Sequence, residues 1–191
     1  MNNTFRKRVF TPETLVKSIA AIAKDLPRLP KLLYPDAISP AFREKLFLAV
    51  TSVNKCRYCT WMHSEIAGNN GVDGVQIAAL LSSSVDADFG DEKEALVYAV
   101  HFAETERNPT KTRTGRLIAK YGEEKAAQIV QYLNLIYFAN LSGNTFDAFL
   151  SRLDGNAPEA GNAAFEAAFA ALAAPALLAV RAVYGKNEVA A

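Results

Sequence analysis

A long apolar segment in the second half of the chain most constrains its fold. After Glu123 the sequence continues as AAQIVQYLNLIYFANLSGNTFDAFL over residues 126–150. Its apolar side chains recur at helical spacing, and no segment of convincing length elsewhere alternates with the period of a strand. The chain also has no internal repeat and no glycine loop of the kind that binds phosphate. We therefore expect an all-α fold.

Capping signals place a second important helix. Ser39-Pro40 combines an N-cap residue with a proline in the first turn. The segment that follows carries apolar residues around most of its circumference, which is typical of a helix in the middle of a core. Thr11-Pro12 gives the same signal for an amphipathic helix ending near Lys24. Further helices are predicted at residues 72–81, 91–106, 110–121 and 159–184, with Gly68 and Gly122 as helix ends, a kink at Gly143 and an interruption at Pro175.

These elements predict three regions. Residues 1–38 form an N-terminal arm and helix, of which residues 1–10 are polar, basic and expected to be solvated. Residues 39–153 form the core domain, and residues 154–191 form an alanine-rich helical extension. Half of the 191 residues are hydrophobic, so the chain can bury a substantial core.

Charge and hydropathy exclude several partners. The formal net charge is +1, which gives no reason to expect binding to nucleic acid. The uncharged run at residues 167–180 is short for a membrane span and contains Pro175, so we expect no membrane role. The N-terminus lacks the apolar run of a signal peptide, and the cysteine usage fits a reducing compartment. A cytoplasmic location is the default expectation.

The candidate site lies in the stretch REKLFLAVTSVNKCRYCTWMHSEIAG, residues 43–68, which holds both cysteines of the chain. Cys56 and Cys59 form a C-x-x-C motif, and His63 follows Cys59 by four residues. On a helix these three side chains converge on one face. A thiol at a helix N-terminus is acidified, and a nearby histidine can accept its proton. The pattern is typical of a dithiol that cycles through a disulfide.

Other interpretations of the cysteines remain open. A structural zinc site needs four ligands, and only Glu44 or His101 could complete the set, without a second ligand pair. Covalent haem attachment needs a histidine directly after Cys59, where Thr60 stands. Two buried, inert cysteines are the third possibility, because free cysteine behaves as a small hydrophobe.

The spacing of four polar residues resembles a known family. Glu44 precedes Cys56 by twelve positions, which gives E-x(11)-C-x-x-C-x-x-x-H, and LFLAVTSVNKCRYC leads into the motif. This pattern resembles the alkylhydroperoxidase D-like (AhpD-like) family of the carboxymuconolactone decarboxylase superfamily, over roughly residues 41–153. The resemblance implies an all-helical AhpD-like fold with the C-x-x-C motif at the N-terminus of a central helix, and a homo-oligomer, commonly a trimer or hexamer.

The resemblance also implies roles for the motif residues. Cys59 attacks a hydroperoxide, Cys56 resolves the product as a disulfide, and His63 and Glu44 relay protons. An external dithiol or disulfide reductase restores the thiols, with no cofactor and no metal. Founding members of the family carry a histidine just before the second cysteine, where this chain has Tyr58. Tyr58 and Trp61 are the weaker candidates for a substrate pocket.

Two other functions compete with the hydroperoxidase. The first is a lyase of the carboxymuconolactone decarboxylase type that acts on a small carboxylated metabolite. The second is a non-enzymatic module that binds a metal or senses redox state. The amides of Asn134, Asn140 and Asn144 either face a pocket or subunit interface or contact neighbouring helices, because buried amides need partners.

Overall fold

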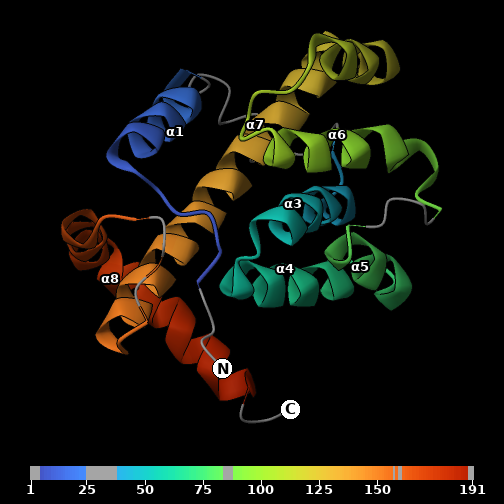
Figure 1. Ribbon diagram of the computed structural model, residues 1–191. Helices are drawn as coiled ribbons and strands as arrows, with labels where there is room; N and C mark the ends of the chain where they lie inside the picture. The colour runs from blue at the N-terminus through green and yellow to red at the C-terminus, as the bar shows by residue number, and fades with distance from the viewer. Residues whose placement is uncertain (1–4, 25–37, 84–87, 157, 159–160, 189–191) are drawn as a thin grey trace.

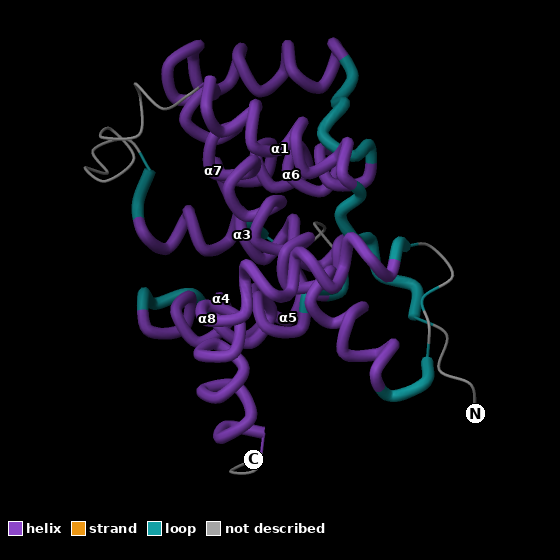
Figure 2. The backbone as a smooth tube through the Cα atoms, turned by 90° about the vertical axis from the view of Figure 1, so that its left-hand side faces the viewer, coloured by secondary structure: helices purple, strands orange, loops and turns teal. Residues whose placement is uncertain are grey.

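The computed structural model describes residues 5–24, 38–83, 88–156, 158 and 161–188. Within these ranges it contains helices and loops and no strand, as Figure 2 shows, so the predicted all-α class is confirmed. None of the described helices is long and apolar enough to cross a membrane. The proline-rich connector predicted at Pro27, Pro30 and Pro35 lies outside the described residues.

The long helix α7 (Lys111–Leu153) runs diagonally through the molecule (Figure 1). It changes direction at Gly122, whose φ of 78° and ψ of 164° are not helical. The prediction that one helix stops at Gly122 and a second follows is therefore confirmed, although the two join directly. The predicted kink at Gly143 is wrong, because Gly122 is the residue with non-helical backbone angles inside α7.

Helix α3 (Pro40–Asn54) is the predicted central helix. It contacts α7 and three shorter helices: α4 (Arg57–Asn69), α5 (Gly74–Leu81) and α6 (Lys93–Glu104). Helix α3 and these three helices lie on one side of α7 in Figure 1. Leu46, Leu48 and Val50 of α3 are inaccessible to solvent, and Ser39 caps the helix by accepting a hydrogen bond from the backbone N–H of Phe42. The apolar circumference of α3 is thus used for packing on several faces at once.

Two predictions about helix ends need correction. Helix α4 continues past Gly68, and the left-handed residue is Gly71 instead. The backbone N–H of Val72 donates to Ala67 and that of Gly71 to Gly68, which is a Schellman arrangement. Helix α8 (Ala163–Glu188) runs through Pro175, where an interruption was predicted. A proline removes one backbone hydrogen bond from a helix, and here that loss does not end it.

Most of the N-terminal residues are packed rather than solvated, so that expectation was wrong for residues 5 and 7–10, while Arg6 is exposed. Phe10 is buried, and its ring contacts Phe138 of α7 and Phe169 of α8. The backbone N–H of Phe10 donates to the hydroxyl of Thr145 at 2.9 Å. The segment then enters α1 (Pro12–Lys24), which lies along α7. The arm is thereby fixed between α7 and α8, close to the cysteines.

Candidate active site

A tight turn between α3 and α4 places both cysteines. Helix α3 ends at Asn54, Lys55 has a left-handed φ of 56°, and Cys56 caps α4. The side chain of Cys56 accepts a hydrogen bond from the backbone N–H of Cys59 at 3.4 Å. The motif therefore lies at the N-terminus of a helix, as predicted, where the unpaired N–H groups favour negative charge.

The two sulfur atoms are in contact. The Sγ atoms of Cys56 and Cys59 lie 2.7 Å apart as free thiols that share one S–H···S hydrogen bond. Both side chains are buried. Because the sulfurs already touch, a disulfide between them needs only a small rearrangement of the side chains.

Burial and the shared hydrogen bond make the two thiols unequal. The hydrogen bond with Cys59 holds the pKa of Cys56 below its usual value, against the opposite effect of burial. The backbone N–H of Cys59 and the nearby Lys7 act in the same direction. The same hydrogen bond, together with burial, raises the pKa of Cys59 well above its usual value. The dithiol therefore loses its first proton as a pair, with the negative charge on Cys56.

A buried carboxylate and histidine lie beside the cysteine helix. Glu44 of α3 is 1% exposed and His63 of α4 is 7% exposed. Oε2 of Glu44 lies 2.6 Å from Nδ1 of His63, while the guanidinium of Arg43 donates to Oε1 of Glu44. The ring of Phe47 packs edge-on against His63. A carboxylate held by Arg43 accepts the hydrogen of Nδ1, which leaves Nε2 as the ring nitrogen able to take up a proton.

The sequence predicted four site residues, and the structure arranges them as two contacting pairs. Cys56 and Cys59 form one pair, and Glu44 and His63 form the other. His63 lies one turn after Cys59 on α4, so that helix carries one member of the second pair, while Glu44 comes from α3. Together they place a dithiol, a proton acceptor and the carboxylate that orients it in one buried region.

A cluster around Asp147 of α7 was not predicted. Asp147 is buried and accepts three hydrogen bonds: from the Tyr58 hydroxyl at 2.6 Å, from Arg57 at 2.7 Å and from Lys7 at 2.9 Å. Burial and the bond to Asp147 raise the pKa of Tyr58 to about 12. Tyr58 therefore stays protonated at neutral pH, and its hydroxyl donates a hydrogen bond to the carboxylate of Asp147. The one sequence signal for this cluster is a lone aspartate inside an apolar helix, which needs partners when buried.

Helix α7 also presses directly on the cysteines. Gly143 faces them so closely that a Cβ atom there would lie 2.8 Å from Cys56 Sγ. Asn140 donates to the hydroxyl of Thr51 at 3.0 Å and accepts from Asn54. Its amide lowers the pKa of Cys59, against the larger opposing effects of Cys56 and burial. Asn144 donates to the backbone carbonyls of Asn54 and Arg8. The amides of Asn140 and Asn144 thus hold neighbouring segments around the cysteines, which was one of the two alternatives for them.

Two further candidates were Trp61 and His101. Trp61 is half-buried on α4. The imidazole of His101 accepts a hydrogen bond from the backbone N–H of Thr110 and so supports the start of α7. Among the described residues, no three His, Cys, Asp or Glu side chains are grouped so that they could hold a metal ion. The zinc alternative therefore has no ligand set within the described part of the chain.

One family model matches part of the chain. The model of the carboxymuconolactone decarboxylase family matches residues 27–104. This segment is therefore similar to the carboxymuconolactone decarboxylase family. It contains all four motif residues, whereas the α7 residues that pack on the cysteines lie outside it. Searches of curated proteins and of solved structures found no significant match.

Proposed function

We propose that this protein is a member of the carboxymuconolactone decarboxylase family and a dithiol oxidoreductase of the alkylhydroperoxidase type. The observation that carries the proposal is the contact of the two free sulfurs at 2.7 Å, with His63 on the same helix α4 and paired to Glu44 of α3. Hydrogen peroxide or an organic hydroperoxide is the proposed oxidant. An external dithiol or a disulfide reductase is the proposed reductant.

The proposed cycle begins with the protons of the dithiol. His63 takes up the first proton, and the shared S–H proton passes to Cys56, which leaves Cys59 as the thiolate. Glu44 stabilises the protonated imidazole through its 2.6 Å contact with Nδ1. The lowered pKa of Cys56 favours the first of these steps, because it allows the pair to lose a proton more readily than an isolated buried thiol.

The oxidation then proceeds in two steps. Cys59 Sγ attacks one peroxide oxygen, the O–O bond breaks, and the leaving alkoxide takes the proton from His63 to give an alcohol. Cys59 becomes a sulfenic acid. The thiol of Cys56 attacks that sulfur and water leaves, which produces the disulfide. One external dithiol returns both cysteines to thiols by exchange and is itself oxidised to a disulfide.

Hydroperoxide turnover by single and double variants tests this proposal. Wild-type protein supplied with a dithiol should consume cumene hydroperoxide, and Cys59→Ser should abolish turnover. Cys56→Ser should still form a sulfenic acid on Cys59 that a dimedone probe traps. Trapping on Cys56 in the Cys59→Ser variant instead would reverse the two roles. Turnover that survives in the double variant would overturn the proposal.

A lyase of the decarboxylase type is the second candidate, favoured by the description of the matching family. Its activity would not depend on the cysteines. Decarboxylation of a small carboxylated lactone by the Cys56→Ser/Cys59→Ser double variant, at the wild-type rate, would establish it. Loss of all activity in the double variant would count against it.

We also propose that the chain forms a homo-oligomer, a trimer or a hexamer. Support comes from α8, where Leu172 is 87% and Leu178 is 51% exposed. A partner chain that covered these two side chains would remove their apolar surface from water. Light scattering coupled to size-exclusion chromatography should give three or six chains per particle. A monomer at micromolar concentration would contradict this proposal.

A further inference from the structure

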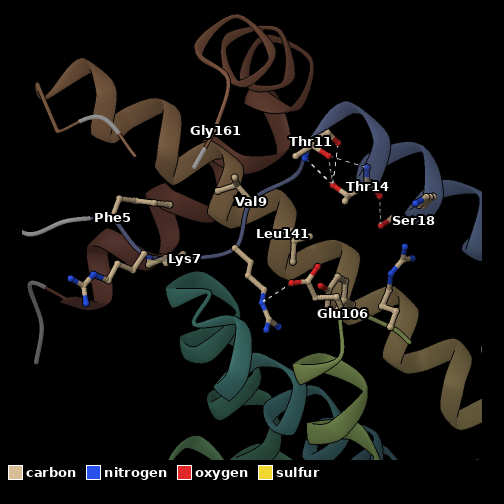
Figure 3. Close-up of a pocket in the computed structure, with 14 residues that line it drawn as sticks. Phe5, Lys7, Val9, Thr11, Thr14, Ser18, Glu106, Leu141 and Gly161 are labelled. Carbon is tan, nitrogen blue, oxygen red and sulfur yellow. Dashed lines mark hydrogen bonds and ion pairs between the residues drawn. The ribbon is translucent and has the colours of Figure 1, made fainter. Parts of the chain in front are cut away.

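A cavity of about 560 Å³ lies beside the N-terminal arm, next to the site described above, with which it shares Lys7. Its walls come from residues 5–18, the loop after α6, and α7 (Figure 3). Every residue that lines it falls outside residues 27–104, the segment matched by the family model. The volume is within the range of ordinary small-molecule sites. The cavity is therefore formed by parts of the chain that precede and follow residues 27–104 in the sequence.

The lining is strongly basic. It includes one carboxylate, Glu106, and five cationic side chains: Arg6, Lys7, Arg8, Lys17 and Arg107. Three of the cations contact carboxylates, since Lys7 pairs with Asp147, Arg8 with Glu106 and Lys17 with Glu13. The excess positive charge therefore rests with the two arginines that remain, Arg6 and Arg107.

Arg107 has the environment of a ligand-binding guanidinium. It is half-buried, and it packs over the ring of Tyr137 with 5.5 Å between Cζ and the ring centroid. Among the described residues, the ion pairs around the cavity join Lys7 to Asp147, Arg8 to Glu106 and Lys17 to Glu13, and none involves Arg107. Burial without such a partner lowers the pKa of Arg107. A counter-ion in the cavity would offset this cost, because desolvated charges are stable only when paired.

The backbone that presents Arg107 is strained. Glu106 and Arg107 are consecutive non-glycine residues with left-handed φ values of 53° and 69°. This conformation is unfavourable for residues with a Cβ atom. Arg8 stabilises this turn from across the cavity by donating to the carbonyls of Ala103 and Glu104 at the end of α6. Strain of this kind is often kept where it aims a side chain at a ligand.

The other walls suit an organic rather than a purely inorganic anion. Val9 and Leu141 supply apolar surface in the middle of the cavity, between the arm and α7 (Figure 3). Thr11, Thr14 and Ser18 place hydroxyl groups at the α1 end. We propose that this cavity binds a small organic anion, with Arg107 holding its carboxylate or phosphate group and Val9 and Leu141 contacting its apolar portion.

Calorimetric titration of the full-length protein tests the proposal with matched probes. Sodium hexanoate, hexyl phosphate and 1-hexanol share one apolar chain and differ in the head group. One or both anions should bind saturably, one per chain, and the neutral alcohol should bind at least about tenfold more weakly. The tighter of the two anions identifies carboxylate or phosphate as the preferred group. Absence of saturable anion binding, or equal binding of hexanol, would overturn the proposal.

Variants locate the site independently of the cysteine chemistry. Arg107→Gln should weaken binding of the anion by about 10- to 100-fold, as expected for loss of a charge-assisted hydrogen bond. Arg107→Lys keeps the positive charge and should retain part of the affinity. This result would show that the loss in Arg107→Gln comes from the missing charge and not from misfolding. Arg116→Gln, an exposed change on α7 outside the cavity, should leave affinity unchanged. Unchanged affinity in both Arg107 variants would refute the role of Arg107, whatever the outcome of the hydroperoxide assays.

Discussion

Replacing Gly143 by alanine tests the close packing of α7 on the cysteines. A Cβ at this position would lie 2.8 Å from Cys56 Sγ and 3.3 Å from Cδ2 of Tyr58. Carbon–sulfur contacts this short are repulsive, so the sulfur or the helix must move. Cys56 is inaccessible to solvent and held by Cys59, which leaves its sulfur little room to yield.

Two opposing effects set the size of the change. Alanine is favoured over glycine inside a helix by about 0.5–1 kcal/mol. Overpacking a close-packed core costs about 1–3 kcal/mol. Gly143→Ala should therefore lower the free energy of unfolding by up to about 2 kcal/mol. The displaced sulfur should also slow thiol oxidation by up to about 100-fold, as expected for a misplacement near 1 Å.

Gly115→Ala is the matched control. Gly115 lies in the same helix, and nothing lies within 4 Å of the position its Cβ would take. This variant should be more stable than wild type by about 0.5–1 kcal/mol, with unchanged oxidation. Urea unfolding and stopped-flow thiol oxidation measure both effects. If Gly143→Ala matched Gly115→Ala in stability and in rate, the packing argument would be refuted.

Three further predictions concern the arm, the histidine and the thiols. Phe10→Ala should lower the free energy of unfolding by about 3–5 kcal/mol, because it removes a buried ring between α7 and α8. The exposed Val16→Ala should change it by less than about 0.5 kcal/mol; similar urea midpoints for the two would show that the arm is not docked. His63→Gln should slow the first thiol oxidation about 100-fold, since the amide can still contact Glu44 but cannot take up a proton. An unchanged rate in stopped-flow mixing would remove His63 from the mechanism. Cys59→Ala should move the first thiolate titration to higher pH, followed by ultraviolet absorbance, because the hydrogen bond that most lowers the pKa of Cys56 is lost. A titration at the same or lower pH would contradict this assignment of the charge.

The sequence was sufficient where the signals are local. Ser39-Pro40 marks the start of α3, and the spacing of Cys56, Cys59 and His63 predicts one shared helix face. The cap at Gly68 was wrong by three positions, since the chain offers Gly68 and Gly71 close together and local rules do not choose between them. Helix ends are therefore the least certain part of such predictions.

Contacts between segments far apart in the chain could not be predicted from the sequence. Asp147 meets Tyr58 across 89 positions and Lys7 across 140. Nothing near any of these residues in the sequence marks the others as partners. The arm was expected to be solvated because its basic residues dominate its composition, while the burial of Phe10 depends on rings supplied by α7 and α8. Tertiary packing decided both cases.

Single-turnover mixing of the reduced protein with cumene hydroperoxide, with thiols counted before and after, tests the dithiol mechanism most directly. We expect loss of both thiols per chain, with mass spectrometry locating one disulfide between Cys56 and Cys59. Dithiothreitol should restore the thiols, and Cys59→Ser should not lose its remaining thiol to a disulfide within the chain. Retention of both thiols in excess peroxide would contradict the proposed function.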